Sequence, residues 1–138
     1  MIANGPIAVA ICALLVGVSC VPKGKTVTTT SGLEYRIVVP GAGSVARPGD
    51  SVRIHETTTL ADGTLIYTTR TKNSPVKFLL GGNQVIAGVD EGVTGMRVGE
   101  RRTLVVPPSL SKRSSYPENT PPEATLYYDI ELVEVFPQ

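Results

Sequence analysis

The stretch IAGVDEGVTG at residues 86–95 decides the fold, because no other part of the folded region has a comparable helical hydrophobic pattern. Its apolar residues Ile86, Val89 and Val93 recur at helical spacing and would form one apolar stripe. Gly95 follows directly, and glycine commonly ends helices. The sequence therefore predicts one short helix of two to three turns, from about Ile86 to Thr94.

Strand patterns surround this helix on both sides. Runs rich in β-branched and aromatic residues alternate with Pro-Gly, Asp-Gly and Gly-Gly turns. These runs cover residues 33–39, 51–60, 64–69, 76–80, 101–106 and 126–135. A sheet with one apolar face must bury that face, and the helix is the only candidate to cover it. We therefore expect an α+β fold, a curved antiparallel β-sheet of about six strands wrapped over one short α-helix.

Composition limits the possible functions. The 138 residues suit a single domain. Thirteen Lys and Arg balance twelve Asp and Glu, giving a net charge of +1, so the basic surplus usual for nucleic-acid binders is missing. One His and two Cys are too few for a structural zinc site built from four His and Cys ligands. We expect no nucleic-acid partner, no metal and no cofactor, and a monomer.

The N-terminal region has the features of an export signal. Residues 7–20 contain 12 apolar residues of 14, which is short of the roughly 20 that span a bilayer and matches a signal-peptide core. Cys20 ends this run as in a bacterial lipoprotein processing site, so Cys20 is the candidate for lipidation. Plain secretion and a misassigned start codon are the alternatives.

These features divide the chain into three parts. Residues 1–20 are a signal peptide or lipoprotein signal, residues 21–31 are a polar linker, and residues 32–136 are the folded domain. We expect a location in the cell envelope, periplasmic or otherwise extracytoplasmic, with membrane contact through the N-terminal signal or a lipid on Cys20.

Several segments of the folded domain together resemble the FKBP-type peptidyl-prolyl cis-trans isomerases. They include SGLEYRIVVPGAG at 31–43, RPGDSV at 47–52, QVIAGVDEGV at 84–93, MRVGE at 96–100 and PPEATLYYDIEL at 121–132. Their order and spacing carry the resemblance more than any one of them. It implies a sheet wrapped around one short helix, and isomerisation of proline-containing segments of unfolded or exported proteins without a nucleophile, metal or cofactor.

The resemblance also implies a shallow apolar pocket that binds a twisted Xaa-Pro amide. The corresponding residues are Val85, Ile86, Tyr128, Val89, Ile66 and Val76. The Ile86 N–H would donate to the substrate carbonyl. This chain departs from the family where Val89 replaces the tryptophan of the pocket floor, and where Ile66 and Val76 replace aromatic residues. Because most aromatic lining is missing, a catalytically weak or inactive peptide-binding or chaperone module is the alternative to an isomerase, and a structural lipoprotein is a third.

A polar rim is expected around this pocket from Glu56, Tyr67, Arg70 and Lys112. Glu56 shares strand parity with the inward residues Val52 and Ile54, and an inward carboxylate is costly unless it is paired. We predict a Glu56–Arg70 salt bridge with the Tyr67 hydroxyl nearby. The alternative is a Glu56 at a wet rim and an Arg70 on the surface.

Two further features have less specific interpretations. The loop at residues 107–122, with Lys112, Arg113 and Tyr116, would overhang the family's site, where it either grips a peptide or is simply a mobile loop. His55 lies on the outward parity of its strand, which favours a solvated surface residue over a catalytic one.

Overall fold

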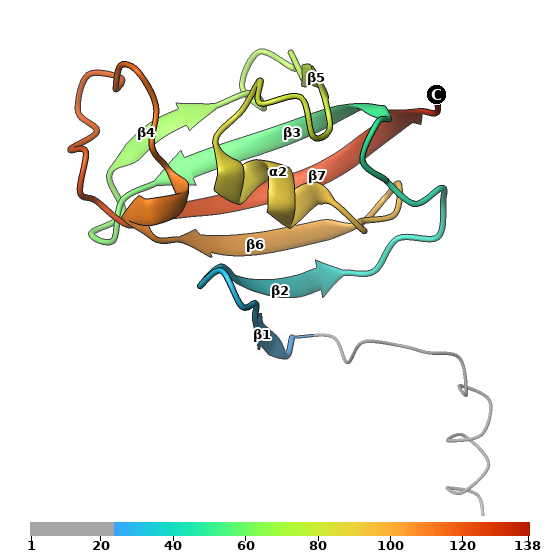
Figure 1. Ribbon diagram of the computed structural model, residues 1–138, viewed down its shortest axis with the longest axis horizontal. Coiled ribbons are helices and arrows are strands. Elements are labelled where there is room, and N and C mark those ends of the chain that lie inside the picture. Colours follow the sequence, from blue (N-terminus) through green and yellow to red (C-terminus); the bar gives the residue numbers. More distant parts are fainter. Residues whose placement is uncertain (1–23) are drawn as a thin grey trace, which may run out of the picture.

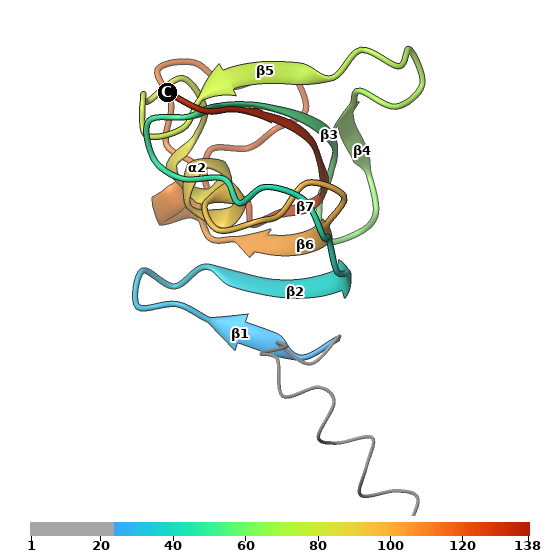
Figure 2. The ribbon, with the colours of Figure 1, turned by 90° about the vertical axis from the view of Figure 1, so that its right-hand side faces the viewer.

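A curved antiparallel sheet wraps around one short helix in the computed structural model, which describes residues 24–138 (Figures 1 and 2). The strands are β1 (Thr26–Thr28), β2 (Glu34–Val39), β3 (Ser51–Thr59), β4 (Leu65–Thr68), β5 (Val76–Leu79), β6 (Arg101–Val106) and β7 (Leu126–Phe136). The helix is α2 (Ala87–Val93), and a 3-10 turn covers Pro108–Leu110. The predicted α+β architecture is confirmed.

The sheet has the strand order β1-β2-β6-β7-β3-β4, and β5 also pairs with β3. All six strands expected from the sequence form within two residues of the predicted ends. The seventh strand, β1, is a difference, because Thr26–Thr28 lies in the segment expected to be a linker. It pairs antiparallel with β2, with Val27 opposite Tyr35. Alternating Thr and Val suit a short edge strand, which a polar composition alone does not reveal.

Two glycines set the distance between α2 and the sheet. A Cβ atom added to Gly88 would lie 2.5 Å from Val106 Cγ1, and one added to Gly92 would lie 2.5 Å from Leu104 Cδ1. Real Cβ atoms do not come this close, so the helix can approach β6 only because both positions lack a side chain. This close packing buries the predicted stripe of Ile86, Val89 and Val93.

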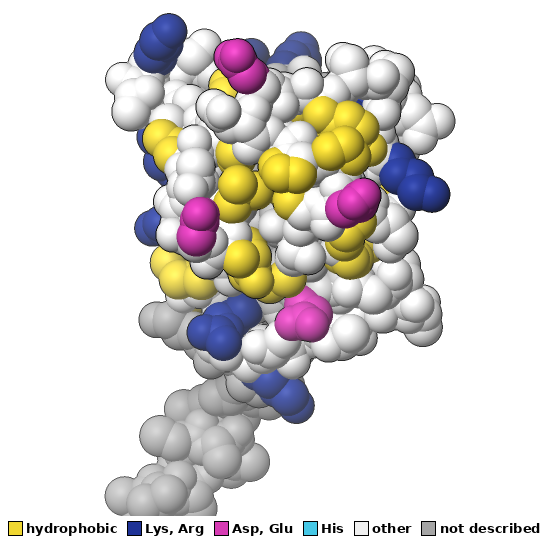
Figure 3. Space-filling view, turned by 90° about the vertical axis from the view of Figure 1, so that its left-hand side faces the viewer, with side chains coloured by type: hydrophobic (Ala, Val, Ile, Leu, Met, Phe, Trp, Pro, Cys, Tyr) yellow, Lys and Arg dark blue, Asp and Glu magenta, His cyan; other side chains and the backbone are white. Residues whose placement is uncertain are grey.

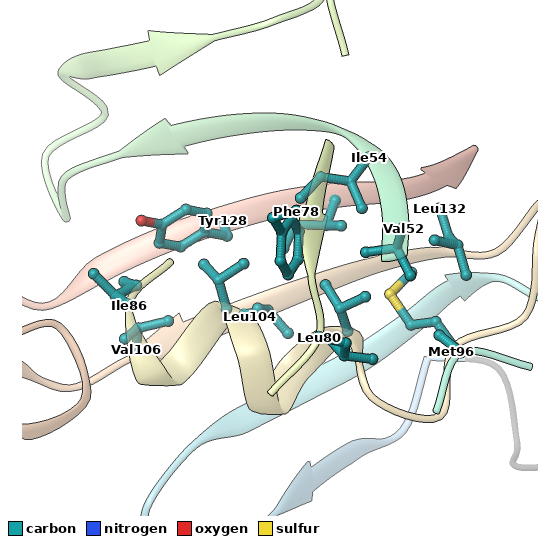
Figure 4. Packing of buried hydrophobic residues seen from close by; sticks show 14 of the residues in the cluster. Val52, Ile54, Phe78, Leu80, Ile86, Met96, Leu104, Val106, Tyr128 and Leu132 are labelled. Carbon is teal, nitrogen blue, oxygen red and sulfur yellow. The ribbon is translucent and has the colours of Figure 1, made fainter. Parts of the chain in front are cut away.

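The hydrophobic core lies between the concave face of the sheet and the helix (Figure 4). Alternate residues of β3 and β7 supply much of it, as the period of two predicts. The core includes Val52, Ile54, Phe78, Leu80, Met96, Leu104, Ile130 and Leu132. Tyr128 lies at one end of this cluster in Figure 4, next to Ile86, and marks the boundary between core and site.

The free edge of β3 is divided between two strands. β5 pairs with Ser51–Ile54, and β4 pairs with Thr57–Thr59. Between them the buried Thr69 binds the β3 backbone, because its N–H donates to the Glu56 carbonyl at 3.0 Å and its Oγ1 accepts from the Glu56 N–H at 2.9 Å. The same hydroxyl lies 2.8 Å from His55 Nδ1. His55 is therefore half-buried and hydrogen-bonded, where the sequence indicated a solvated residue.

Candidate functional site

Two adjoining cavities open at the end of the molecule where α2 begins. The first, here the helix cavity, has a volume of about 440 Å³. It is lined by Glu56, Asn83, Gln84, Val85, Ile86, Val89, Lys112, Arg113, Ser114 and Tyr128. The second, here the loop cavity, has about 300 Å³ and is lined by Glu56, Thr58, Ile66, Tyr67, Arg113, Pro117, Thr120, Leu126 and Tyr128. Figure 3 views this end of the molecule, where hydrophobic side chains lie among acidic and basic ones.

The start of α2 is held in place by two side chains that bind the preceding turn. Gln84 Oε1 accepts from the Leu79 N–H at 2.9 Å. The Asp90 carboxylate accepts from the Gly81 N–H at 2.9 and 3.1 Å. Ile86 precedes the first helical turn with an extended backbone, and its N–H has no acceptor within residues 24–138. The helix cavity thus contains a residue whose backbone donor is unused.

Glu56 lies at the junction of the two cavities and lines both. Its inward direction confirms the prediction from strand parity, since Val52 and Ile54 of the same face are fully buried. Within the described residues its carboxylate has neither a hydrogen bond nor an ion pair. Burial raises the pKa of the Glu56 carboxyl, and the charge of Arg113 offsets this only in part.

Tyr128 forms a wall shared by the two cavities. The residue is 6% exposed, and its hydroxyl points away from the hydrophobic cluster (Figure 4). Burial, followed by the charge of Glu56, raises the pKa of the Tyr128 hydroxyl, while Arg113 and Thr58 act in the opposite direction. The hydroxyl therefore stays protonated at neutral pH and is able to donate a hydrogen bond.

The predicted Glu56–Arg70 salt bridge is wrong. Arg70 binds Thr57 Oγ1 at 2.7 Å and Asp129 Oδ1 at 3.4 Å. Thr57 follows Glu56 in the strand and so lies on the opposite face of the sheet. Arg70 therefore belongs to the outer face, where Asp129 also pairs with Arg101 at 2.7 Å.

The other predicted site residues divide between the cavities. Lys112 lines the helix cavity, and Ile66 and Tyr67 line the loop cavity. Tyr67 is 49% exposed, so it borders the loop cavity at its rim. Val76 lines neither of these cavities and instead packs against the core.

Arg113 is the residue that sequence reasoning missed. The sequence placed it only in an overhanging loop, whereas the structure brings it to both cavities beside Glu56 and Tyr128. Its Nε atom is buried and has no hydrogen-bond partner within the described residues. The inward Glu56 indicated that a cation should be close. The path of the long loop decides which cation that is, and no local pattern shows it.

The family model described as FKBP-type peptidyl-prolyl cis-trans isomerase matches residues 43–133. The chain belongs to this family. It is 45% identical over 122 residues to FK506-binding protein 2 of Candida glabrata, covering 84% of this chain and 88% of that protein. It is 42% identical over 106 residues to the peptidyl-prolyl cis-trans isomerase FPR2 of Saccharomyces cerevisiae, covering 75% and 78%.

Solved structures of FKBP proteins share the fold. FkpA from Escherichia coli superposes with a TM-score of 0.73 at 35% identity, over 84% of this chain and 53% of that chain. AtFKBP13 gives a TM-score of 0.71 at 27% identity, over 80% and 98%. The chain is thus an FKBP-type peptidyl-prolyl cis-trans isomerase by family, and the resemblance drawn from its motifs is confirmed.

The predicted signal segment at residues 1–20 and Cys20, the candidate lipidation site, lie outside the described residues. In the described part, no helix has the length and hydrophobicity needed to cross a membrane. Residues 24–138 also contain no group of three or more His, Cys, Asp and Glu side chains placed to hold a metal ion.

Proposed function

We propose that this FKBP protein catalyses cis-trans isomerisation of Xaa-Pro bonds in unfolded segments of exported proteins. The observation that carries the proposal is the composition of the helix cavity. Apolar surface from Val85, Val89 and Tyr128 lies beside two hydrogen-bond donors, the Ile86 N–H and the Tyr128 hydroxyl. A proline ring needs such a surface, and the adjoining carbonyl needs a donor.

The mechanism requires no covalent step. Rotation about a peptide bond crosses a barrier of about 18–20 kcal/mol, because the planar amide loses its resonance on twisting. An apolar cavity that fits the twisted form, with a donor to the carbonyl oxygen, stabilises the transition state more than the planar ground state. In this chain Val89 and Tyr128 would contact the proline ring, and the Ile86 N–H would donate to the carbonyl oxygen.

Export and the cell envelope form the second part of the proposal. Support comes from the apolar run at residues 7–20 and from Cys20 at its end. Unfolded chains in that compartment contain Xaa-Pro bonds that exchange over tens of seconds or more without catalysis. We propose that the protein acts there as a monomer, tethered by a lipid or released by cleavage.

Two observations favour a second function, a peptide-binding or chaperone module with little turnover. Val89 provides less apolar surface at the cavity floor than the tryptophan that the family carries there. Glu56 also adds a carboxylate to the cavity wall. Both features weaken the stabilisation of a twisted amide more than the binding of an extended peptide.

Isomerisation of Leu-Pro and Lys-Pro tetrapeptides should be measured with the full chain by NMR exchange spectroscopy, which needs no coupled protease. The Val89→Trp variant is the matched comparison, because Val89 lines the helix cavity and a tryptophan there would add the aromatic surface that this chain lacks. Catalysed exchange by the wild-type protein would support the isomerase. Peptide binding without exchange, combined with exchange by Val89→Trp, would refute it in favour of the binding module.

A further inference from the structure

The Glu56 carboxylate has no hydrogen-bond or ion-pair partner among residues 24–138, and it lies at the junction of the helix cavity and the loop cavity. The two cavities share only Glu56, Arg113 and Tyr128, so a peptide that extends from one cavity into the other passes Glu56. Glu56 occupies an inward position of β3, and the two hydrogen bonds with Thr69 hold its backbone in place. Its direction into the site is therefore set by the sheet.

A ligand that fills these cavities must satisfy the Glu56 carboxylate. Glu56 is half-buried and lines both cavities, so a peptide that fills them would remove the remaining access of solvent to its carboxylate. Removing the last water from an uncompensated carboxylate is costly, whereas a ligand that brings a hydrogen-bond donor, best of all a cation, avoids that cost. An entirely apolar peptide is thus at a disadvantage.

The groups that face Glu56 do not already neutralise it. Arg113 and Lys112 come from the long loop, Tyr128 from β7 and Tyr67 from β4. No nitrogen of Arg113 or Lys112 lies within 4.0 Å of a Glu56 oxygen, since the ion pairs of the described residues involve other side chains. Lys112 is exposed to solvent, so water screens its repulsion of a second cation.

We propose that Glu56 is a specificity-determining residue, which makes the site prefer Xaa-Pro segments with a Lys or Arg side chain next to the proline. The inference rests on the proposed function for the use of the site, but it concerns peptide recognition and holds for a binding module as well. Tyr67 at the rim of the loop cavity offers an aromatic surface for the aliphatic part of such a side chain.

The test uses tetrapeptides that differ only beside the proline, with Lys, norleucine or Glu placed before it in one series and after it in another. Calorimetry with the full chain gives the dissociation constant, and NMR exchange gives the turnover. In one series we expect Lys to bind about fivefold more tightly than norleucine, and Glu to bind less tightly than both.

Glu56→Gln should reduce the preference for Lys over norleucine to less than about twofold, because the amide keeps the shape and loses the charge. Glu123→Gln is the matched control, since Glu123 is exposed and lines neither cavity. Arg113→Gln should increase the preference, because it removes the cation that partly offsets Glu56.

Acidification gives a test that needs no variant. Burial raises the pKa of Glu56, so its charge is lost at a higher pH than that of an exposed carboxyl. The raised pKa of Tyr128 keeps its hydroxyl protonated over that range, and the peptide Lys also stays charged. The preference for Lys should therefore fall as the pH is lowered, while circular dichroism reports that the fold is intact.

Each outcome decides the proposal. A preference for Lys that Glu56→Gln removes and Glu123→Gln retains supports it. Equal binding of Lys and norleucine, tighter binding of Glu, or a preference that survives in Glu56→Gln overturns it. Lys-selective binding without turnover would refute only the isomerase function, and turnover without selectivity would refute only the role of Glu56. Failure of every peptide to bind would overturn both.

Discussion

At the scale of single residues, the charged form of Glu56 lowers the free energy of unfolding, and the size of this effect depends on pH. The raised pKa of Glu56 means that the folded protein holds this proton more tightly than the unfolded chain does. Protonation of Glu56 therefore favours the folded state. This contribution to the free energy of unfolding is fully present below the pKa of Glu56 in the unfolded chain, and it is lost as the pH rises through the pKa in the folded protein. Glu56→Gln should therefore raise the free energy of unfolding by about 1 kcal/mol at pH 7.

Urea unfolding at pH 7 and at pH 4 checks this expectation. The difference between Glu56→Gln and the wild-type protein should shrink at the lower pH, where the wild-type carboxyl gains its proton. A variant that is less stable at pH 7 would show that the carboxylate has a stabilising partner. A charge that costs stability in the free protein and is kept in a cavity is consistent with a role in recognition.

The Tyr128 hydroxyl is the second residue-scale prediction. Tyr128→Phe keeps the ring in the wall of the helix cavity and removes one donor, so turnover should fall about fivefold to tenfold with little change in stability. The control is Tyr127→Phe, because Tyr127 is exposed and neighbours Tyr128 on the other face of β7. Equal turnover by both variants would assign no role to the Tyr128 hydroxyl.

At the scale of elements, the contact between α2 and β6 depends on the absence of side chains. Gly88→Ala should destabilise the protein by about 2 kcal/mol, although alanine favours helices, because the new methyl would lie 2.5 Å from Val106. Val106→Ala in the same chain removes the atom that it would meet. A double-mutant cycle by chemical denaturation should therefore give a favourable coupling of about 1 kcal/mol between the two substitutions. Additive effects would mean that the helix shifts freely.

At the scale of the whole molecule, the buried Arg102 joins the helix to two strands. Its guanidinium lies 2.6 Å from the Glu100 carboxylate, donates to the Gly92 carbonyl at 3.2 Å, and stacks on Tyr35 at 4.3 Å. Arg102→Ala leaves the buried Glu100 carboxylate without its ion-pair partner and with only the hydrogen bond from the Arg97 N–H at 3.1 Å. The free energy of unfolding should therefore fall by about 3 kcal/mol.

Thermal unfolding of Arg102→Ala beside Arg36→Ala checks this role. Arg36 is exposed and makes one long hydrogen bond of 3.4 Å to Thr26, so its removal should have little effect. Similar melting temperatures for the two variants would contradict the role assigned to the Arg102 pair.

The strands and the helix follow from short-range patterns, which is why they could be predicted closely. A run such as residues 126–135 alternates inward and outward whatever its neighbours are, and the direction of Tyr128 follows from that rule. The strand β1 was missed because three residues at a sheet edge carry too little pattern. Its stability comes from pairing with β2.

The sequence by itself determined that Glu56 points inward and that the α+β fold has one helix, because strand and helix periods act over a few residues. The grouping of Ile86, Val89 and Tyr128 at one site followed from the resemblance to the FKBP family, since no local period joins the helix to β7. The tertiary structure decided which charges meet. Arg70 joins Asp129 on the outer face, and Arg113 arrives beside Glu56 from the long loop. Which charged groups become neighbours depends on the paths of loops between distant strands, and those paths are set by packing and hydrogen bonds across the whole chain.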